Sequence, residues 1–371
     1  MAAKGDSGMA TTARPAQRAA GQPAEWPAFE ADVPGGLAAF ARAELVRLPS
    51  GLVRLEPAAA DPLAAAVRFD YGGDPRALLR LRTVLSVARV GRFAVPRPRA
   101  LLGDQHLRRL LGLIAAVRGL HPPDAFASLH LSAAGAGSAV MTRLKAVLAE
   151  ATGLRLVERE GDLRLRLRRP PGGGEGWEAL VRLSPRPLAA RPWRVCNRPG
   201  ALNAAVAAVM VALTRPRPDD CFLNLLCGSG TLLIERLISG PASRVIGCDT
   251  DPAALDCARA NIAAAGLAGA VELQPWDARA LPLPSASVDA LCADLPFGHL
   301  VGSHQANLAL YPALLREAAR VARPGARCVL ITHEARLLAR LLAGAPDWRV
   351  EQELRLALET LRPRIVVLIR W

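Results

Sequence analysis

The segment Asp294-Leu295-Pro296-Phe297-Gly298 combines groups that suit one particular chemistry, and it directly follows an apolar, strand-like stretch. The Asp294 carboxylate and the Leu295 carbonyl can each accept one N–H bond from an aromatic amine. Pro296 would stiffen the turn, and Phe297 would stack on a base taken out of its helix. The pattern therefore predicts a catalytic site that aligns an exocyclic base nitrogen with an activated methyl group. The alternative is a plain turn, because Asp-x-Pro is common in turns.

A glycine turn earlier in the chain decides between these alternatives. Residues 224–231 read Asn-Leu-Leu-Cys-Gly-Ser-Gly-Thr, after a strand-like run and before a helical one. Gly228 and Gly230 allow a sharp turn with close approach of a ligand, and the free amides at the helix start suit an anion. The methionine carboxylate of S-adenosylmethionine is such an anion. The predicted cofactor contacts in this run are Asn224, Cys227, Gly228, Ser229, Gly230 and Thr231.

Two acidic residues complete the predicted cofactor site. Asp249 ends the next strand-like run and can accept hydrogen bonds from ribose hydroxyls. Asp251 is better placed to cap the helix that begins at Pro252, which leaves Asp249 for the ribose. Asp277, followed by Ala278, comes after a further strand and would accept a hydrogen bond from the adenine amino group. The order of the motifs favours S-adenosylmethionine over a nicotinamide, whose glycine pattern is longer.

The back half of the chain alternates strand-like and helical segments. The expected strands are residues 221–226, 244–248, 271–274, 288–293 and 327–332, and the expected helices are residues 230–237, 252–265, 307–322 and 334–342. Two final strands, 348–356 and 364–369, are joined by a short connection. This α/β rhythm predicts a Rossmann-like, doubly wound parallel sheet that ends in an antiparallel hairpin.

The front half mixes shorter elements. Helical spacing appears at 36–48, 75–90 and 138–152, while residues 163–168 alternate Leu and Arg as a half-buried strand does. These arginines would either contact phosphates or form a solvated face, and the solvated face is favoured. The glycine-rich stretch 170–174 predicts a hairpin loop, and the proline-rich stretch 186–200 predicts the connection between domains.

Composition bounds the partners and the compartment. The formal net charge of +14 and the isoelectric point near 10.8 suit a nucleic-acid partner, although only two of the 47 basic residues are lysine, which also fits a coding bias. The seven cysteines include no C-x-x-C pair, so we expect no zinc site and reduced thiols in a cytoplasmic protein. No apolar run is long enough to cross a membrane. Residues 1–27 predict a disordered tail.

Taken together, the motifs resemble the THUMP-domain tRNA guanosine-N2 methyltransferases. The likeness is strongest at residues 294–298 with Gly302, Asn307-Leu308 and Tyr311, and at a junction formed by residues 191–194 and 198–202. It implies a class I methyltransferase domain over 191–371, preceded by an α+β RNA-binding region. That region would comprise a ferredoxin-like module over 28–95 and a THUMP domain over 96–190.

The resemblance also implies the substrate. We expect a monomer that methylates guanosine N2 in tRNA, at position 6 of the acceptor stem. The implied RNA contacts are Arg191, Arg194, Arg198, Phe297, Gly298 and His299. The chain departs from the family at Asn224, where an Asp is usual. Three alternatives stay open: methylation of another RNA site, methylation of a DNA amino group, and a non-catalytic RNA-binding protein that keeps the fold.

Overall fold

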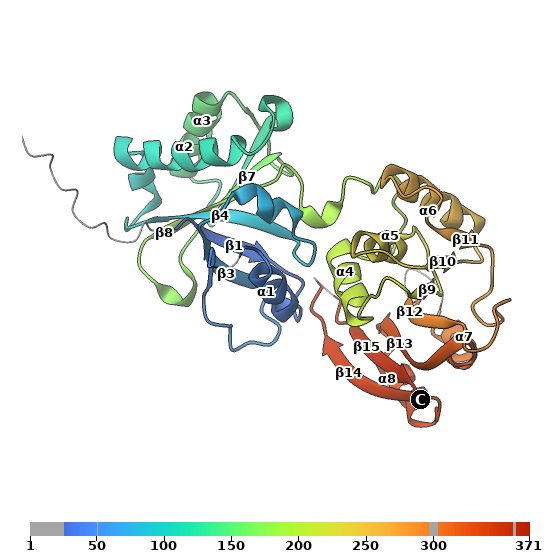
Figure 1. The fold of residues 1–371 in the computed structure, drawn as a ribbon. Helices are drawn as coiled ribbons and strands as arrows, with labels where there is room; N and C mark the ends of the chain where they lie inside the picture. The colour runs from blue at the N-terminus through green and yellow to red at the C-terminus, as the bar shows by residue number, and fades with distance from the viewer. Residues whose placement is uncertain (1–25, 50, 297–302, 359–360) are drawn as a thin grey trace, which may run out of the picture.

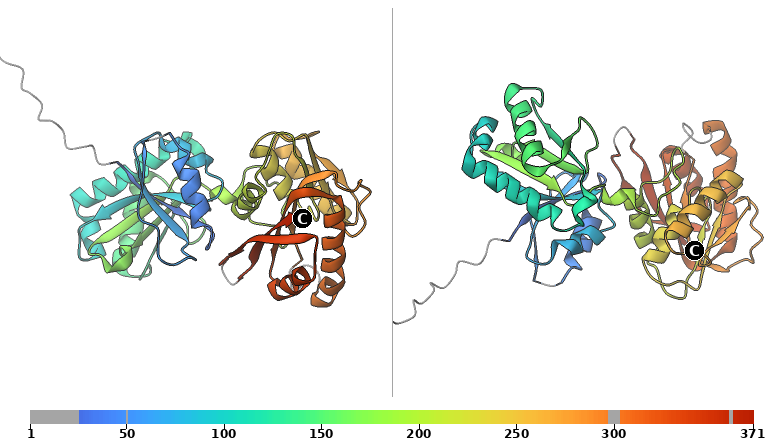
Figure 2. Two further views of the ribbon diagram at one scale, coloured as in Figure 1. Left: turned by 60° about the horizontal axis from the view of Figure 1, so that its bottom comes forward. Right: turned by 90° about the horizontal axis from the view of Figure 1, so that it is seen from above.

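The computed structural model describes residues 26–49, 51–296, 303–358 and 361–371, and these form two lobes. Figures 1 and 2 show a blue-to-green N-terminal lobe and a yellow-to-red C-terminal lobe, and the chain that follows the short 3-10 helix η5 (Leu188–Ala190) leads from one to the other. This segment falls within the stretch 186–200 that is predicted to connect the domains, and the domain boundaries stay predictions. The predicted tail, residues 1–27, lies outside the described residues except for its last two.

The N-terminal lobe is built on one eight-stranded sheet with the order β2-β3-β1-β4-β8-β7-β5-β6. Its helices α1, α2 and α3 contribute Leu45, Leu110 and Leu144 to the same core as the strand residues Phe29 and Phe69. The strands are β1 (Ala28–Asp32), β2 (Val53–Leu55), β3 (Ala66–Tyr71), β4 (Ser86–Phe93), β5 (Ser128–Ala133), β6 (Arg155–Leu156), β7 (Leu163–Arg168) and β8 (Trp177–Arg182). The helices are α1 (Ala38–Val46), α2 (Asp104–Arg118) and α3 (Ala139–Thr152).

The helix predicted over residues 75–90 is wrong. The structure has only a short 3-10 helix, η1 (Pro75–Arg80), followed by β4 in the middle of the sheet. β4 pairs with β1 on one side and with β8 on the other. Its buried residues include Val87 and Val90, and β-branched side chains of this kind pack well in a strand. Pairing on both edges therefore overrides the local helical spacing.

The eight-stranded sheet runs without a break across the predicted boundary between residues 95 and 96. β4 comes before this boundary and β8 after it, and the two strands are paired along their length. On the sheet face opposite the helices, the buried carboxylates of Glu30 and Glu178 are held by Arg68 and Arg168. The division of this lobe into modules 28–95 and 96–190 stays a prediction, and both share one continuous sheet.

The C-terminal lobe confirms the predicted α/β architecture. Its seven strands have the order β11-β10-β9-β12-β13-β15-β14, with β9 to β13 parallel and β14 and β15 antiparallel to their neighbours in the final hairpin. The strands are β9 (Cys221–Asn224), β10 (Arg244–Cys248), β11 (Glu272–Gln274), β12 (Val288–Asp294), β13 (Ala322–Thr332), β14 (Trp348–Arg355) and β15 (Arg364–Arg370). The helices are α4 (Ala204–Leu213), α5 (Thr231–Ile238), α6 (Pro252–Ala264), α7 (His304–Val321) and α8 (Ala335–Ala343).

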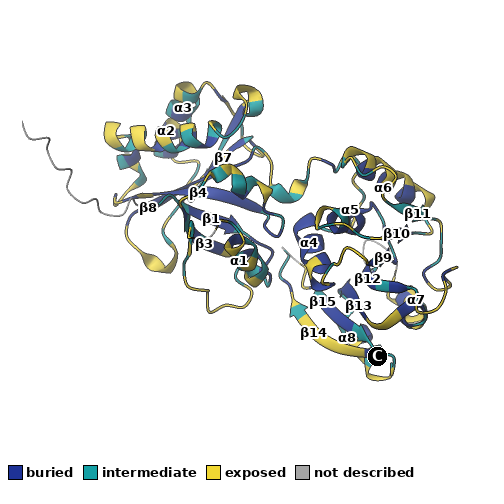
Figure 3. Ribbon diagram, viewed as in Figure 1, coloured by how far each residue is buried: buried dark blue, intermediate teal, exposed yellow. Residues whose placement is uncertain are grey.

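Burial follows this architecture, as Figure 3 shows: the central strands are buried and the outer faces of the helices are exposed. The helix α4 is an exception, because nine of its ten residues are buried. No helix among the described residues is long and apolar enough to cross a membrane.

The two lobes are joined by a buried carboxylate. Glu235 of α5 is fully buried, and its carboxylate accepts hydrogen bonds from Arg82 Nε at 2.9 Å and from Arg191 Nε at 2.8 Å. Arg191 also donates to the backbone carbonyls of Leu188 and Arg82. The Glu235 carboxylate thus binds one cation of the N-terminal lobe, Arg82, and one cation of the connection, Arg191.

The prediction that all seven cysteines are reduced is wrong for two of them. Cys196 of the connection and Cys257 of α6 form a disulfide, while the other five are free. The two are 61 residues apart in the chain, and their Cα atoms lie 5.4 Å from each other. The sequence offers no spacing pattern for this pair, since it depends on the connection folding back onto α6.

Candidate active site

The glycine turn has the geometry that its residues predict. After β9 the chain passes through Gly228 and Gly230, which have positive φ angles of 51° and 81°, and Gly230 caps the start of α5. A Cβ atom on Gly230 would lie 3.2 Å from the Cβ of Ala258, so a side chain there meets both strain and crowding. The Cys227 amide donates to the Cys248 carbonyl at 2.8 Å, which fixes the turn to β10.

Asp249 holds this turn from the neighbouring strand. Its Oδ2 accepts the Gly228 amide at 2.9 Å, and its Oδ1 accepts the Asp251 amide at 3.0 Å. Asp251 caps α6, as predicted, by accepting the Ala253 amide at 2.9 Å. Asp249 therefore lies directly beside the glycine turn, where a carboxylate can reach both the turn and a ribose.

The third acidic position is more exposed. Asp277 accepts the backbone amide of Arg279 at 2.9 Å and forms an ion pair with its guanidinium. The hydrogen bond from Arg279 lowers the pKa of Asp277, so this carboxylate is ionised at neutral pH. Ala278 beside it is buried. The adenine contact at Asp277 and Ala278 stays a prediction.

Two acceptor oxygens without partners lie at the carboxyl edge of adjacent strands. Asn224 at the end of β9 is 1% exposed, and Asp294 ends β12; Cys292, two residues before it, pairs with Asn224. Among the described residues neither Asn224 Oδ1 nor Asp294 Oδ1 has a hydrogen-bond partner, and both atoms are inaccessible to solvent. Buried oxygens of this kind are normally paired, so the two acceptors mark a place for a donor from a ligand.

Burial changes the ionisation of Asp294. It raises the pKa of this carboxyl to about 7, because the charged form is poorly solvated there. A carboxyl with this pKa can both accept an N–H bond and take up a proton near neutral pH. This is the strongest shift on an acidic group among those that line the edge of the sheet, and it falls on the residue predicted to be catalytic.

The segment after Asp294 is held by residues from two other elements. The Leu295 amide donates to the Ile331 carbonyl of β13 at 3.0 Å. The Pro296 carbonyl accepts hydrogen bonds from Asn307 Nδ2 and Tyr311 Oη of α7, each at 2.9 Å. The sequence pointed to Asn307 and Tyr311 only through the family resemblance. Phe297, Gly298 and His299 lie outside the described residues, so their predicted roles stay predictions.

The three arginines expected to contact RNA have different surroundings. Arg191 is 9% exposed and donates to Glu235 and to the Arg82 carbonyl, and its expected RNA contact stays a prediction. Arg194 donates to the Leu202 carbonyl at 2.8 Å and to Thr231 Oγ1 at 3.1 Å, so it lies against the start of α5. Arg198 is about a third exposed and pairs with Asp251, and the expected RNA contacts of Arg194 and Arg198 stay predictions.

These residues fit S-adenosylmethionine. The glycine turn and the start of α5 would hold the methionine end, the unpaired Asn224 Oδ1 would accept its amino group, and Asp249 would bind the ribose. No group of three or more metal-ligating side chains occurs within the part of the chain that the structure describes.

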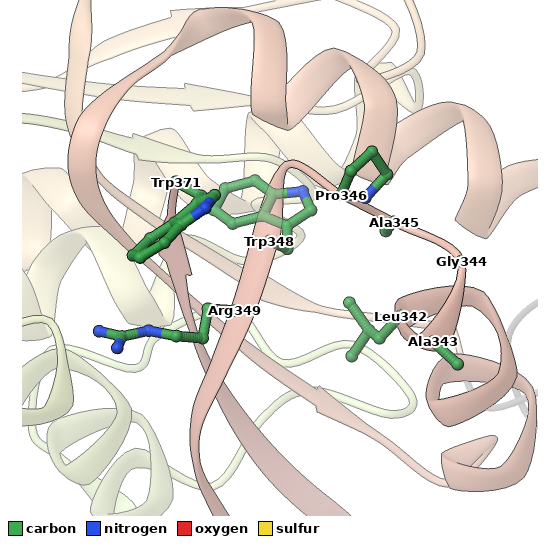
Figure 4. Close-up of a pocket in the computed structure, with 8 residues that line it drawn as sticks. All are labelled: Leu342, Ala343, Gly344, Ala345, Pro346, Trp348, Arg349 and Trp371. Atoms are coloured by element: carbon green, nitrogen blue, oxygen red, sulfur yellow. The ribbon is translucent and has the colours of Figure 1, made fainter.

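A separate hollow of about 480 Å³ lies elsewhere on the C-terminal lobe (Figure 4). Trp348, Arg349 and Trp371 line it, with the Arg349 guanidinium 5.3 Å from the centre of the Trp371 ring. Trp348 starts β14 and Trp371 follows β15, which places both at the amino ends of the parallel strands. The hollow is therefore on the opposite edge of the sheet from Asp294.

Comparison with known proteins agrees with this site. Residues 191–364 match the family model described as RMKL-like, methyltransferase domain (UPF0020). The mouse (Mus musculus) tRNA (guanine(6)-N(2))-methyltransferase THUMP3 is 35% identical over 166 residues, which are 41% of this chain and 32% of the relative. The match thus spans about a third of the length of that relative.

Two solved structures share the whole architecture. TrmN from Thermus thermophilus is 26% identical, with a TM-score of 0.70 over 93% of this chain and 100% of that chain. The structure of SMU.472 complexed with SAH has a TM-score of 0.65 and 15% identity, over 92% of this chain and 98% of that chain. The methyltransferase family model and the mouse relative indicate S-adenosylmethionine as the cofactor of the C-terminal lobe. The family model and the two structures thus agree on a methyltransferase fold for the C-terminal lobe.

Proposed function

We propose that this protein transfers a methyl group to the exocyclic N2 amine of a guanosine in tRNA, at position 6 of the acceptor stem. The proposal rests mainly on Asp294 Oδ1, which is buried at the end of β12 and has no hydrogen-bond partner within the described ranges. Asp294 lies two residues after Cys292, and Cys292 pairs with Asn224 on the neighbouring strand. A relative named tRNA (guanine(6)-N(2))-methyltransferase and the TrmN structure support the choice of amine and RNA.

The residues of the chain perform the orienting steps. Asp294 accepts one N–H bond of the amine, and the Leu295 carbonyl accepts the second, so the nitrogen lone pair is directed away from both. S-adenosylmethionine supplies, when bound, a methyl group already activated by the adjacent positive charge. Because the donor is activated, alignment and electrostatics account for most of the rate. The amine loses a proton, and Asp294, with a pKa near 7, can hold it.

The front lobe would bind the RNA in this proposal. We assign residues 28–95 to a ferredoxin-like module and 96–190 to a THUMP domain, which share the eight-stranded sheet. Among the arginines of β7, Arg168 is held by Glu30 and Glu178, whereas Arg164 and Arg166 are exposed. Two exposed cations two residues apart on one sheet face suit phosphate contacts. The monomeric state and the cytoplasmic location stay predictions.

The test is a transfer assay with labelled S-adenosylmethionine and purified full-length protein. Bulk tRNA, ribosomal RNA and duplex DNA serve as separate substrates, and the labelled nucleoside is identified by mass spectrometry. N2-methylguanosine in tRNA only is the expected product. Label in DNA or on adenosine would refute the choice of amine, and no label in any nucleic acid would refute the enzymatic proposal.

A further inference from the structure

The Pro296 carbonyl is the best-held backbone group beside the candidate acceptors. It accepts from Asn307 Nδ2 at 2.9 Å and from Tyr311 Oη at 2.9 Å, so both of its lone pairs are used. Asn307 and Tyr311 are four residues apart on α7 and therefore share one face of that helix. Both are fully buried.

The Tyr311 hydroxyl is in turn fixed from the other side. Thr332 Oγ1, at the end of β13, lies 2.8 Å from Tyr311 Oη, and the Glu334 amide donates to Thr332 Oγ1 at 2.9 Å. Since the Pro296 carbonyl can only accept, the Tyr311 hydrogen is directed to Pro296, and the Thr332 hydroxyl hydrogen is therefore directed to Tyr311. Hydrogen bonds that run in one direction in this way strengthen one another.

This arrangement determines the backbone of the acceptor segment. The ring of Pro296 sets its φ angle, and the two hydrogen bonds on its carbonyl set its ψ angle. On the other side, the Leu295 amide is held by the Ile331 carbonyl at 3.0 Å. The Leu295 carbonyl, which is the second acceptor of the proposed function, lies between these two held points.

We propose that Tyr311, Asn307 and Thr332 are positioning residues that clamp the Pro296 carbonyl and so aim the Leu295 carbonyl at the amine of the target base. The inference rests on the proposed function for the identity of the amine. The three residues act through the backbone and do not touch the substrate. Their contribution therefore belongs to the rate of transfer and not to the binding of S-adenosylmethionine.

The experiment compares Y311F, N307L and the double variant, with Y71F as the matched control. Tyr71 is also buried, but it lies in the N-terminal lobe. We expect kcat to fall about five- to tenfold in each single variant, because one donor remains. The double variant loses both donors and should fall about 10²-fold. The Kd for S-adenosylmethionine, measured by calorimetry, should change less than twofold. T332V should resemble Y311F, and T332S should restore kcat.

A second measurement does not depend on the substrate. Hydrogen–deuterium exchange of the peptide that contains Leu295 should be faster in the double variant and unchanged in Y71F. Unchanged exchange overturns the clamp, even if the wild type methylates no RNA and the proposed function fails. Faster exchange with unchanged kcat, or a raised Kd that explains the whole loss of activity, overturns the positioning role while leaving the proposed function intact.

Discussion

Replacing Asp294 by asparagine should make the protein more stable at neutral pH while abolishing its activity. Burial raises the pKa of Asp294 from 3.8 to about 7. This shift of about 3 pKa units, at about 1.4 kcal/mol per unit, corresponds to up to about 4 kcal/mol of unfolding free energy. The D294N variant has nearly the same shape but no group to ionise, so it does not bear this cost.

The sign of the pH dependence follows from linkage. The folded state binds the Asp294 proton more tightly than the unfolded state does. Below about pH 4 both states are protonated at Asp294, and the folded protein bears no cost from a buried charge. Stability is lost as the pH rises from there towards 7, the folded-state pKa. The wild type should therefore lose about 2–3 kcal/mol relative to D294N between pH 5 and pH 8.

Urea unfolding of both proteins across this pH range measures the difference, because titrations that both proteins share cancel. D277N is the control of opposite sign: the ion pair with Arg279 lowers the pKa of Asp277, so the wild type should gain stability over D277N as the pH rises from the acid side. A wild-type minus D294N difference that stays flat from pH 5 to pH 8 would refute the desolvated carboxyl and the reasoning built on it.

Three further predictions test the cofactor turn, the contact between lobes and the disulfide. N224D restores a charge for the donor's amino group at a residue 1% exposed, so calorimetry should show S-adenosylmethionine binding about five- to tenfold more tightly; weaker binding would contradict the placement. E235A leaves Arg82 and Arg191 without their buried partner and should lower the unfolding free energy by about 3–5 kcal/mol, measured against the exposed-pair control D256A. Reducing Cys196–Cys257 opens a loop with a sequence separation of 61 and should lower the unfolding free energy by up to about 4 kcal/mol; C221S keeps the disulfide and should respond to reductant like the wild type, whereas C196S should not respond.

The methyltransferase lobe was predictable because its information is local. Each strand and helix there carries its own apolar period, and each ligand-binding residue comes directly after a strand. Asp249, Asp294 and the glycine turn therefore fall at the carboxyl edge as soon as the strands are parallel. The predicted strand over 244–248 has the observed bounds, Arg244–Cys248.

The features that the sequence did not reveal all depend on distant partners. The segment 75–90 has helical spacing, but two flanking strands make part of it a strand. In the sequence Arg191 has no evident partner, because Glu235 lies 44 residues further along the chain. Cys196 and Cys257 pair only because the connection folds onto α6. Local sequence patterns do not show which distant residues will be in contact, because long-range packing determines those contacts.

Asn224 and Asp294 lower the stability of the lobe and serve its chemistry for the same reason. Each keeps an acceptor oxygen that water cannot reach and that no described residue satisfies. Such an oxygen lowers stability by about 1–3 kcal/mol, since its solvation is lost without return. The clamp on Pro296 prevents the neighbouring backbone from turning inward to relieve this loss. The free protein therefore keeps this unfavourable desolvation energy. When a ligand N–H binds to the acceptor oxygen, the new hydrogen bond offsets it. At Asp294 the proposed site favours an amine over a hydroxyl, because only an amine offers two hydrogens to the two acceptors, Asp294 and the Leu295 carbonyl.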